Sequence, residues 1–356
     1  MYPTISEYIE AIKSAEDNFK ELTNLRPVLG DDGKPVMTSG NFAVVFKMQD
    51  IETSKFYALK CFIKDQEGRE EAYHQITEEL KNVDSPYLVS IRYLEKELSV
   101  DSMQTVETEF PVLLMDWVEG KTLDLYISDN INDRFALGML SCSFNRFASW
   151  LISMPFAHGD LTPENIIIRN DRSIVIVDYD GMYVPSMSGQ KAREIGSPDF
   201  RHPERNENDF NGTIDHFSII SILLSLYVIH KEPNYYLKYG AKGRLLFSAS
   251  DYLYINNSIV FSNIPDIIKD DINYKILLEM ACNSKYFNLH KYISNKPILL
   301  KKGLSNTGSK SPLIKNIDKT NNSIVNFEEV GKLLNQPLYN VDLESLKKYI
   351  DNIRDL

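Results

Sequence analysis

The chain has 356 residues, 43% hydrophobic and 11% aromatic, a composition that suits one large or two ordinary globular domains with a sizeable core. Its formal net charge of -11 argues against a surface that binds nucleic acid or anionic lipid through overall basicity. The three cysteines, Cys61, Cys142 and Cys282, are far apart and form neither a disulfide framework nor a zinc-ligand spacing, which favours a reducing compartment.

Two short stretches of the sequence bear on where the protein is located. The N-terminal residues MYPTISEYIE lack the basic stretch and the apolar run of a secretory signal. The most apolar stretch, residues 217–229, is shorter than the roughly 20 residues that a membrane span needs. We therefore expect a cytoplasmic protein without a membrane span, in which residues 217–229 form a buried helix.

The elements in chain order predict two lobes. Apolar residues at helical spacing over residues 6–22 predict an amphipathic helix, within an N-terminal helical extension over residues 1–27. Short β-branched and aromatic runs from about residue 35 to 115 predict strands, with one helix over about 69–82. Longer helical patterns at 134–153 and 210–229 flank the short strands IIIRN and SIVIVDYDG. We therefore expect an α+β fold with a small, mostly β N-lobe (28–116) and a larger, mainly helical C-lobe (117–300).

The remaining residues have a different composition. Residues 301–322 are polar and rich in Ser, Asn, Lys and Gly, so we expect a linker over 301–325. Residues 326–356 suggest two short helices in a C-terminal helical tail. The sequence leaves open whether this tail docks on the main domain or recruits a partner, and it leaves the oligomeric state open.

The segment HGDLTPENIII, which begins at His158, carries the densest chemistry of the chain. It places one carboxylate, Asp160, and one amide, Asn165, ahead of a short apolar strand, and a hairpin then delivers a second carboxylate, Asp178. Such oxygens can hold a divalent cation while one carboxylate orients a nucleophile. A loop that merely contains Asp and Asn is the alternative, but the spacing and the flanking apolar strands favour a site.

A second segment upstream suggests phosphate binding. The stretch TSGNFAVVF (38–46) lies where a phosphate-binding loop would precede Lys60, which is found on an apolar strand. A lysine that points inward from such a strand is costly unless it meets an anion, and ATP phosphates would be that anion. A bare β-hairpin explains the loop alone equally well, so Lys60 carries this interpretation.

Over residues 35 to about 230 the chain resembles the eukaryotic-like Ser/Thr protein kinase superfamily. The stretch GSPDFRHPE, which begins at Gly196, resembles the substrate-facing end of an activation segment, and Asp215 resembles the aspartate that braces the catalytic loop. The details SGNFA, VDYDGMYVP and FRHP are similar to a bacterial branch of the superfamily. The resemblance implies a two-lobed protein kinase-like fold, ATP and Mg²⁺ as cofactors, and a protein substrate whose identity the sequence does not give.

The resemblance also assigns roles to residues. It implies that Asp160 accepts or orients the proton of the acceptor hydroxyl and that Asn165 and Asp178 hold Mg²⁺ on the ATP phosphates. It implies that Lys60 pairs with a glutamate from the next helix, for which we choose Glu71, with Glu78 and Glu79 as rivals. The remaining nucleotide contacts would be Ser39, Gly40 and Asn41 in the phosphate loop, Val45, Ala58 and Ile167 around the adenine, Met115 as gatekeeper, and the main chain of Asp116 and Val118.

Several positions depart from the family pattern. Gly159 replaces the arginine that normally precedes the catalytic aspartate and reads a phosphate on the activation segment, so the chain is of the non-RD type. Thr162 replaces a lysine that helps to neutralise the transferred phosphate, which predicts slow transfer. Tyr179 and Asp180 replace Phe and Gly of the metal segment, with a glycine one step later, and Tyr179 can still pack beside His158.

Three functions are compatible with these residues. An active Ser/Thr protein kinase is preferred, because Lys60, Asp160, Asn165 and Asp178 are all present. An ATP-binding pseudokinase scaffold is suggested by Thr162 and by a phosphate loop that retains only one of the usual glycines. A small-molecule kinase of the aminoglycoside or choline type shares the His-Gly-Asp and Asp-Tyr-Asp pairs, but the activation-segment end argues against it.

Overall fold

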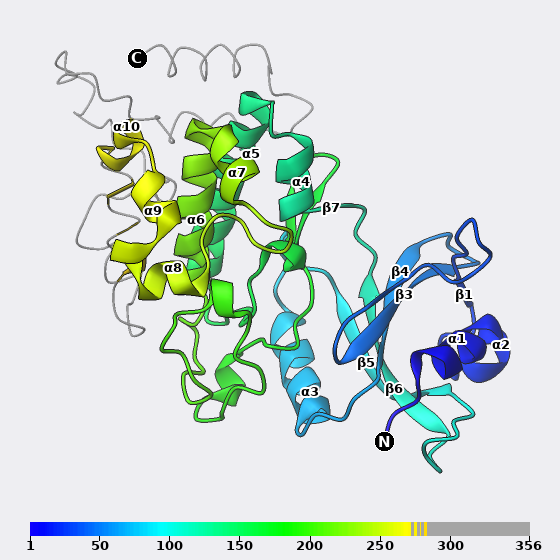
Figure 1. The fold of residues 1–356 in the computed structure, drawn as a ribbon. Coiled ribbons are helices and arrows are strands. Elements are labelled where there is room, and N and C mark those ends of the chain that lie inside the picture. Colours follow the sequence, from blue (N-terminus) through cyan, green and yellow to red (C-terminus); the bar gives the residue numbers. More distant parts are fainter. Residues whose placement is uncertain (272–273, 276–277, 279–280, 283–356) are drawn as a thin grey trace, which may run out of the picture. The chain divides into compact units, whose positions relative to one another are not determined.

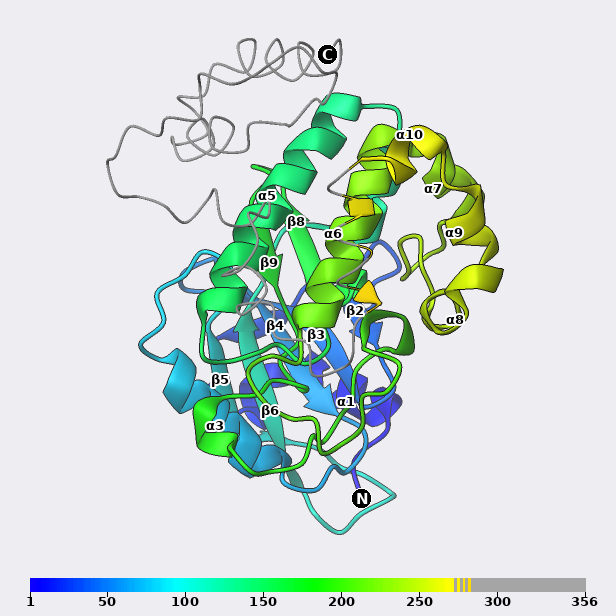
Figure 2. The same cartoon turned by 90° about the vertical axis from the view of Figure 1, so that its left-hand side faces the viewer.

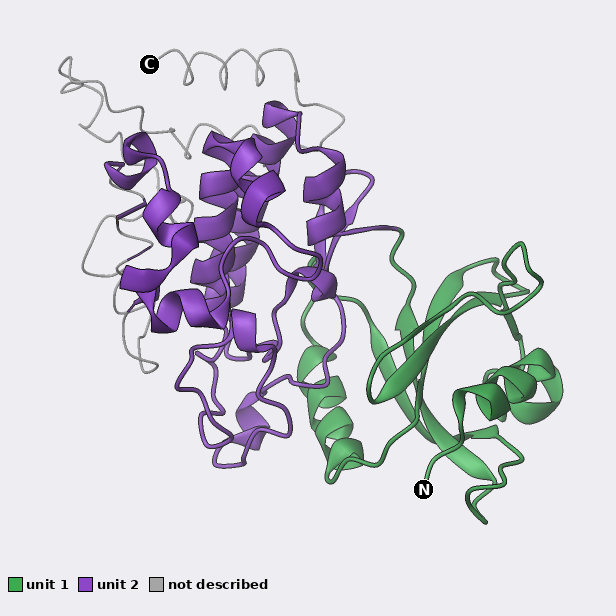
Figure 3. Cartoon of the chain, in the orientation of Figure 1, with its two compact units in different colours: residues 1–119 green, residues 120–356 purple. Residues whose placement is uncertain are grey.

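The computed structural model describes residues 1–271, 274–275, 278 and 281–282, and they form an α+β fold (Figure 1). The chain divides into two compact units, residues 1–119 and residues 120–356 (Figure 3), whereas the predicted boundary between lobes lay after residue 116. The predicted linker over 301–325 and the tail over 326–356 lie outside the described residues. Within the described part of the chain, no helix combines the length and the apolar character that crossing a bilayer requires.

Unit 1 is built on an antiparallel sheet with the strand order β1-β3-β4-β6-β5, and β2 pairs with β3 beside this path. Side chains alternate between the two faces along each strand, so the same sheet offers two surfaces of different composition. The strands are β1 (Leu25–Pro27), β2 (Met37–Ser39), β3 (Ala43–Asp50), β4 (Phe56–Phe62), β5 (Ile91–Ser99) and β6 (Glu109–Asp116).

One face of this sheet is covered by the N-terminal helices α1 (Ile5–Lys13) and α2 (Ala15–Asn18) (Figure 1). The hydroxyl of Tyr8 donates to the carbonyl of Phe62 at 2.7 Å. The single helix predicted over residues 6–22 is wrong, because the chain breaks at Ser14 and Phe19 leaves the helix. The break lets Phe19 and Leu22 join the core that α1 forms on the strands.

The opposite face of the sheet carries four of the predicted nucleotide residues. Val44 and Phe46 belong to the core under α1, so Val45 between them points to the other face. Val45 pairs directly with Lys60 across β3 and β4, and Ala58 pairs with Met115 across β4 and β6. The strand register alone therefore places these four side chains on one surface.

Helix α3 (Arg69–Leu80) confirms the helix predicted over about 69–82. Its buried face is formed by Arg69, Ala72, Tyr73 and Ile76. The ring of Tyr73 stacks on that of Tyr93 from β5, with centroids 5.4 Å apart. This stack is one of the contacts that fix α3 against the edge strand of the sheet.

Unit 2 is mainly helical, with a small sheet of order β7-β8-β9 (Figure 2). The predicted helix over 134–153 is confirmed as α5, and the prediction of a buried helix over 217–229 is confirmed within α6. The elements are β7 (Gly120–Thr122), α4 (Leu123–Asp129), α5 (Arg134–Ser153), β8 (Ile166–Arg169), β9 (Ile174–Ile176), α6 (His216–Lys231), α7 (Pro233–Tyr239), α8 (Ala249–Leu253), α9 (Ile259–Asn263) and α10 (Asp266–Lys269).

The start of α6 differs from the prediction of a helix from residue 210. The Asn211 side chain accepts hydrogen bonds from the main chain and the hydroxyl of Thr213, at 2.9 and 2.7 Å. Such a local turn competes with helix formation, so α6 begins only after Asp215. The delay has a functional consequence, because it places Asp215 at the helix terminus.

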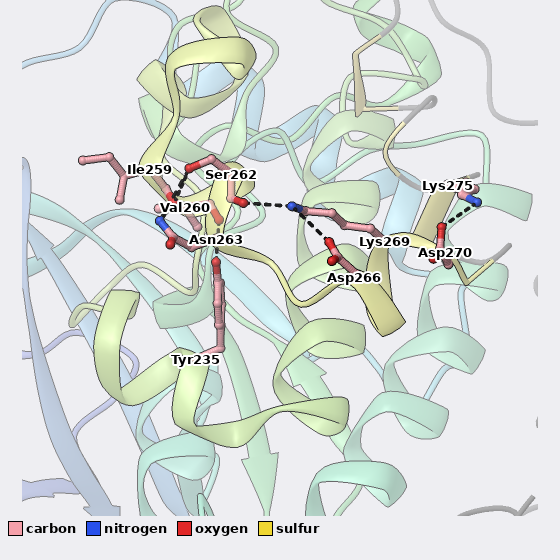
Figure 4. A network of polar contacts seen from close by, with 9 residues as sticks. All are labelled: Tyr235, Ile259, Val260, Ser262, Asn263, Asp266, Lys269, Asp270 and Lys275. Carbon is pink, nitrogen blue, oxygen red and sulfur yellow. Dashed lines mark hydrogen bonds and ion pairs between the residues drawn. The ribbon is translucent and has the colours of Figure 1, made fainter.

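The short helices that follow α6 are joined by polar contacts (Figure 4). The hydroxyl of Tyr235 on α7 donates to the carbonyl of Val260 on α9. Lys269 on α10 donates to the carbonyl of Ser262 at 2.8 Å. These bonds link α7, α9 and α10 into one group beside α6.

The packing of α1 on the sheet can be tested by truncating one buried side chain. Ile12 is fully buried under the strands, so Ile12→Ala should lower the free energy of unfolding by about 2–5 kcal/mol. Urea denaturation measures this change. The control is Glu10→Ala, because Glu10 is an exposed residue of the same helix and should change stability by less than about 0.5 kcal/mol. Equal effects of the two substitutions would contradict the packing of α1.

Candidate functional site

The turn from His158 to Asn165 lies between α5 and β8 in unit 2. The His158 ring is fully buried, and its Nε2 lies 2.9 Å from the carbonyl oxygen of Val177. The N–H of Val177 donates to the carbonyl of Asn165 at 3.0 Å. The two bonds attach both ends of this turn to the segment that follows β9, which carries Asp178.

Within the turn, Asp160 and Asn165 are in contact. Asn165 Nδ2 donates to the Asp160 carbonyl at 2.9 Å and lies 3.4 Å from Asp160 Oδ2. Because the amide nitrogen is directed at Asp160, the Oδ1 atom of Asn165 is the one that a cation would use. Asp160 Oδ1 accepts a hydrogen bond from the main-chain N–H of Ser197 at 2.7 Å.

Asp178 has an unusual backbone conformation. Its φ angle of 67° lies in the left-handed region, which costs a residue with a side chain about 1–2 kcal/mol. Such strain concentrates at functional sites, where the surrounding structure enforces it. The next residue, Tyr179, is fully buried, and its ring meets that of His158 edge-on, with centroids 6.0 Å apart. Tyr179 therefore packs beside His158, as the sequence predicted.

The Asp215 side chain braces the backbone of the turn. Its two carboxylate oxygens accept the main-chain N–H groups of His158 and Gly159, the second at 2.9 Å. The side chain is only 2% exposed, so these charge-assisted hydrogen bonds lie in a low-dielectric environment, where they are strong. The contact agrees with the role that the sequence suggested for Asp215.

Gly159 is required by the packing of the turn. Its φ angle is 84°, and a Cβ atom at this position would lie 1.8 Å from the carbonyl oxygen of Gly181. The sequence presented Gly159 only as a lost arginine and Gly181 only as a shifted glycine. In the structure the two glycines pack against each other, and no other residue fits at position 159.

The end of the predicted activation segment packs on the same turn. Gly196 has a φ angle of 75°, and a Cβ atom there would lie 2.8 Å from the carbonyl oxygen of Gly159. Arg201 Nη1 donates to the Gly196 carbonyl at 2.8 Å. Together with the bond from Ser197 to Asp160, these contacts hold the segment against the turn from His158 to Asn165.

The predicted nucleotide residues of unit 1 occupy different environments. Lys60 is only 4% exposed and lies beside Val45 on the face of the sheet opposite α1, where Ala58 and Met115 are also buried. Ser39, Gly40 and Asn41 are exposed at the turn between β2 and β3, and Glu71 is exposed on α3, away from its buried face. Ile167 lies on β8 in unit 2.

The strand end at Asp116 offers main-chain groups for a ligand. The N–H of Asp116 donates to the Ser90 carbonyl at 3.4 Å, and its carboxylate pairs with Lys55 at 2.7 Å, which raises the pKa of Lys55. Val118 makes no main-chain hydrogen bond within the described residues. Val118 is half-buried, so its main-chain N–H and carbonyl are open to water or to a ligand that supplies an acceptor and a donor.

Gly40 is not explained by the fold of unit 1. A Cβ atom at this position would meet only the Ala43 carbonyl oxygen, 3.9 Å away, and the φ angle of Gly40 is not in the left-handed region. Neither space nor backbone conformation within the chain demands a glycine. A close approach of a ligand to the turn would demand one.

Arg205 is a residue of this site that the sequence did not reveal. It is 8% exposed, and its Nη1 donates to the carbonyl of Gly159 at 3.0 Å. Burial lowers the pKa of Arg205, and the negative charges of Asp215 and Asp160 oppose that shift. An arginine after Pro-Glu in a turn-rich segment carries no periodic signal, so only the tertiary structure identifies it.

The requirement for glycine at position 159 can be tested by comparing two left-handed glycines. Gly159→Ala should lower the free energy of unfolding by about 3 kcal/mol, combining about 1–2 kcal/mol of backbone strain with about 1–3 kcal/mol of overpacking against Gly181. Gly189, with a φ angle of 86° and open space around it, is the matched control and should show the strain alone. Thermal and urea unfolding measure both variants. If the two alanine variants lose the same stability, the packing of Gly159 on Gly181 is wrong.

Comparisons with known proteins identify the family. Residues 34–242 match the model of the protein kinase domain. The chain is 25% identical to the serine/threonine-protein kinase sgk-1 of Caenorhabditis elegans over 56% of this chain and 42% of the relative. It is 23% identical to Sgk1-B of Xenopus laevis over 67% and 56%, and 27% identical to GE16371 of Drosophila yakuba over 45% and 19%.

These matches mean that the chain spans about half the length of its relatives or less. The matched region includes the sheet of unit 1 from β2 onward, the turn at Asp160 and helix α6. The geometry of that turn and the family match agree. The chain therefore belongs to the eukaryotic-like protein kinase superfamily.

Proposed function

We propose that this chain is a Ser/Thr protein kinase that transfers the γ-phosphoryl group of Mg-ATP to a hydroxyl of a protein. The observation that carries the proposal is the contact between Asp160 and Asn165 in a turn braced by Asp215, in a chain with a protein kinase domain. Mg-ATP, when bound, would supply the phosphoryl group, and its metal would neutralise negative charge on the phosphates. We also propose residues 28–300 as the catalytic domain, within a bacterial branch of the superfamily.

Asp160 would act on the acceptor hydroxyl. Its carboxylate is half-buried and is oriented by Ser197 through Oδ1 and by Asn165 near Oδ2. A carboxylate held in this way can accept the proton of a hydroxyl that reaches hydrogen-bond distance. Because the contact with Ser197 comes from the activation-segment end, that segment would help to present the acceptor.

Asn165 and Asp178 would hold Mg²⁺. One offers an amide oxygen and the other a carboxylate, and hard oxygen ligands of this kind suit Mg²⁺. The segment carrying Asp178 is tied to Asn165 through the hydrogen bond of Val177. Their backbones are therefore held together before any cation binds.

The face of the unit 1 sheet opposite α1 would hold the nucleotide. Lys60 is a buried cation on an apolar face, so it fits an anionic phosphate, and Gly40 leaves room for one at the turn after β2. Val118, whose main chain makes no hydrogen bond to other described residues, would meet the adenine edge. The remaining contacts that we propose are Ser39, Asn41, Val45, Ala58, Met115, Asp116 and Ile167, with Glu71 as the partner of Lys60.

Thr162 sets an expectation for the rate. It is buried and stands where the family pattern has a lysine, so the turn offers no cation from this position to the transferred phosphoryl group. We therefore expect slow transfer compared with kinases that retain the lysine.

Transfer of labelled γ-phosphate to the protein itself and to a generic basic protein tests this function. Asp160→Asn should lower kcat about 100- to 10,000-fold, because it removes the proton acceptor while keeping the size of the side chain. The matched control is Asp171→Asn, in the exposed turn between β8 and β9, which should leave kcat unchanged.

The other outcomes separate the competing functions. If the wild type binds ATP without labelling any protein, the pseudokinase scaffold replaces the proposal. If label appears only on an aminoglycoside or choline, the chain is a small-molecule kinase. Label that persists in Asp160→Asn would exclude Asp160 as the proton acceptor.

The metal assignment has its own test. Asp178→Asn should raise the Mg²⁺ concentration for half-maximal transfer at least about tenfold, since it removes one anionic ligand. A titration of MgCl₂ at fixed ATP measures the change, and chelation by EDTA should abolish transfer in the wild type. The control is Asp171→Asn, and an unchanged Mg²⁺ requirement in Asp178→Asn would exclude Asp178 as a ligand.

A further inference from the structure

Two arginines from one segment reach the carbonyls of two glycines that pack on each other. Arg201 Nη1 donates to the Gly196 carbonyl at 2.8 Å, and Arg205 Nη1 donates to the Gly159 carbonyl at 3.0 Å. The Cβ position of Gly196 lies 2.8 Å from that same carbonyl oxygen of Gly159. The catalytic turn and the activation-segment end therefore meet at Gly159, and Arg205 binds at the junction.

The position of Arg205 is energetically demanding. Its Nε and Nη2 atoms are buried and have no hydrogen-bond partner within the described residues. A buried guanidinium is costly unless nearby negative charge compensates it, and here the charges come from Asp215 and Asp160. A cation retained at this cost lies next to the two carboxylates on which the turn depends.

Gly159 is held from both of its main-chain groups. Asp215 accepts its N–H at 2.9 Å, and Arg205 donates to its carbonyl. Asp160 is the next residue, so the orientation of its peptide follows from these two bonds. Because a glycine is conformationally permissive, these two bonds add to its packing on Gly181 in restraining the peptide that joins Gly159 to Asp160.

This arrangement compensates for the arginine that the chain lacks at position 159. In the family pattern an arginine at position 159 connects the catalytic turn to a phosphate on the activation segment, and here that position has no side chain. Arg205 brings a guanidinium to the same peptide from the activation-segment side. Its link between the two segments is a permanent protein contact, and no phosphate takes part in it.

We propose that Arg205 is a positioning residue that fixes Asp160 through the Gly159 carbonyl and makes transfer independent of phosphorylation on the activation segment. The inference rests on the proposed kinase function. Arg205 touches neither the acceptor nor the nucleotide in this scheme. Its loss would therefore lower kcat through a misplaced Asp160 while nucleotide binding is retained.

The test compares Arg205→Met with Arg205→Lys, using protein first treated with a phosphatase. Arg205→Met should lower kcat about 10- to 100-fold, because displacing a catalytic group by about 1 Å has an effect of this size. KM for ATP should stay within about twofold of the wild type, since no nucleotide contact is lost. Arg205→Lys, which keeps a charged donor, should recover part of the rate.

Two controls accompany these variants. Arg146→Met removes a half-buried arginine of α5 that takes no part in the hydrogen bonds described above for Gly159 and Asp160, and it should leave kcat unchanged. Phosphatase treatment of the wild type, and the double substitution of the exposed Ser186 and Ser188 by alanine, should also leave kcat unchanged. A wild type that loses most of its activity with phosphatase would overturn the proposal.

Amide hydrogen exchange gives a readout that needs no activity. In Arg205→Met the amides of Gly159 and Asp160 should exchange at least about tenfold faster, while those of the buried helix α6 keep their rates, which excludes global unfolding. If Arg205→Met retains both wild-type kcat and wild-type exchange at these amides, Arg205 is not a positioning residue. If the wild type transfers no phosphate, the kinase proposal fails, and the exchange experiment still decides whether Arg205 holds the turn.

Discussion

The carboxylate of Asp215 is the constraint on which the turn from His158 to Asn165 depends. It is buried, and it accepts the main-chain N–H groups of His158 and Gly159, so the turn is held by its backbone and not by the side chains that would act on a substrate. The Asn165 side chain contacts Asp160 within this turn. Helix α6, buried along nearly its whole length, provides the rigid support for Asp215.

A second constraint acts in unit 1, where strand alternation separates structure from binding. The face under α1 and α2 is a closed apolar core, and its stability comes from burial. The other face carries the buried side chain of Lys60 beside Val45, together with Ala58 and Met115. The N-terminal helices are thus part of what keeps the strands in register, and the register sets Lys60 opposite Val45.

The departures from the family pattern are connected in the structure. Gly159 and Gly181 look like separate losses in the sequence, yet they pack on each other: a Cβ atom at position 159 would lie 1.8 Å from the Gly181 carbonyl oxygen, whereas one at position 181 would make only ordinary contacts with the turn. Arg205 adds a buried cation at the same place. The turn therefore keeps the bracing aspartate of the family pattern, Asp215, and adds the contact of Arg205 with Gly159.

The sequence by itself determined the fold class, the helices at 134–153 and 217–229, and the motif of the turn from His158 to Asn165 that we propose as catalytic. These follow from hydrophobic periodicity and from motifs that are contiguous in the chain. It could not determine the break at Ser14, the late start of α6, or the role of Arg205. A helix break and a local turn depend on which side chains reach a core or a backbone group. The contact of Arg205 with Gly159 joins residues 46 positions apart, so only the tertiary structure could decide it.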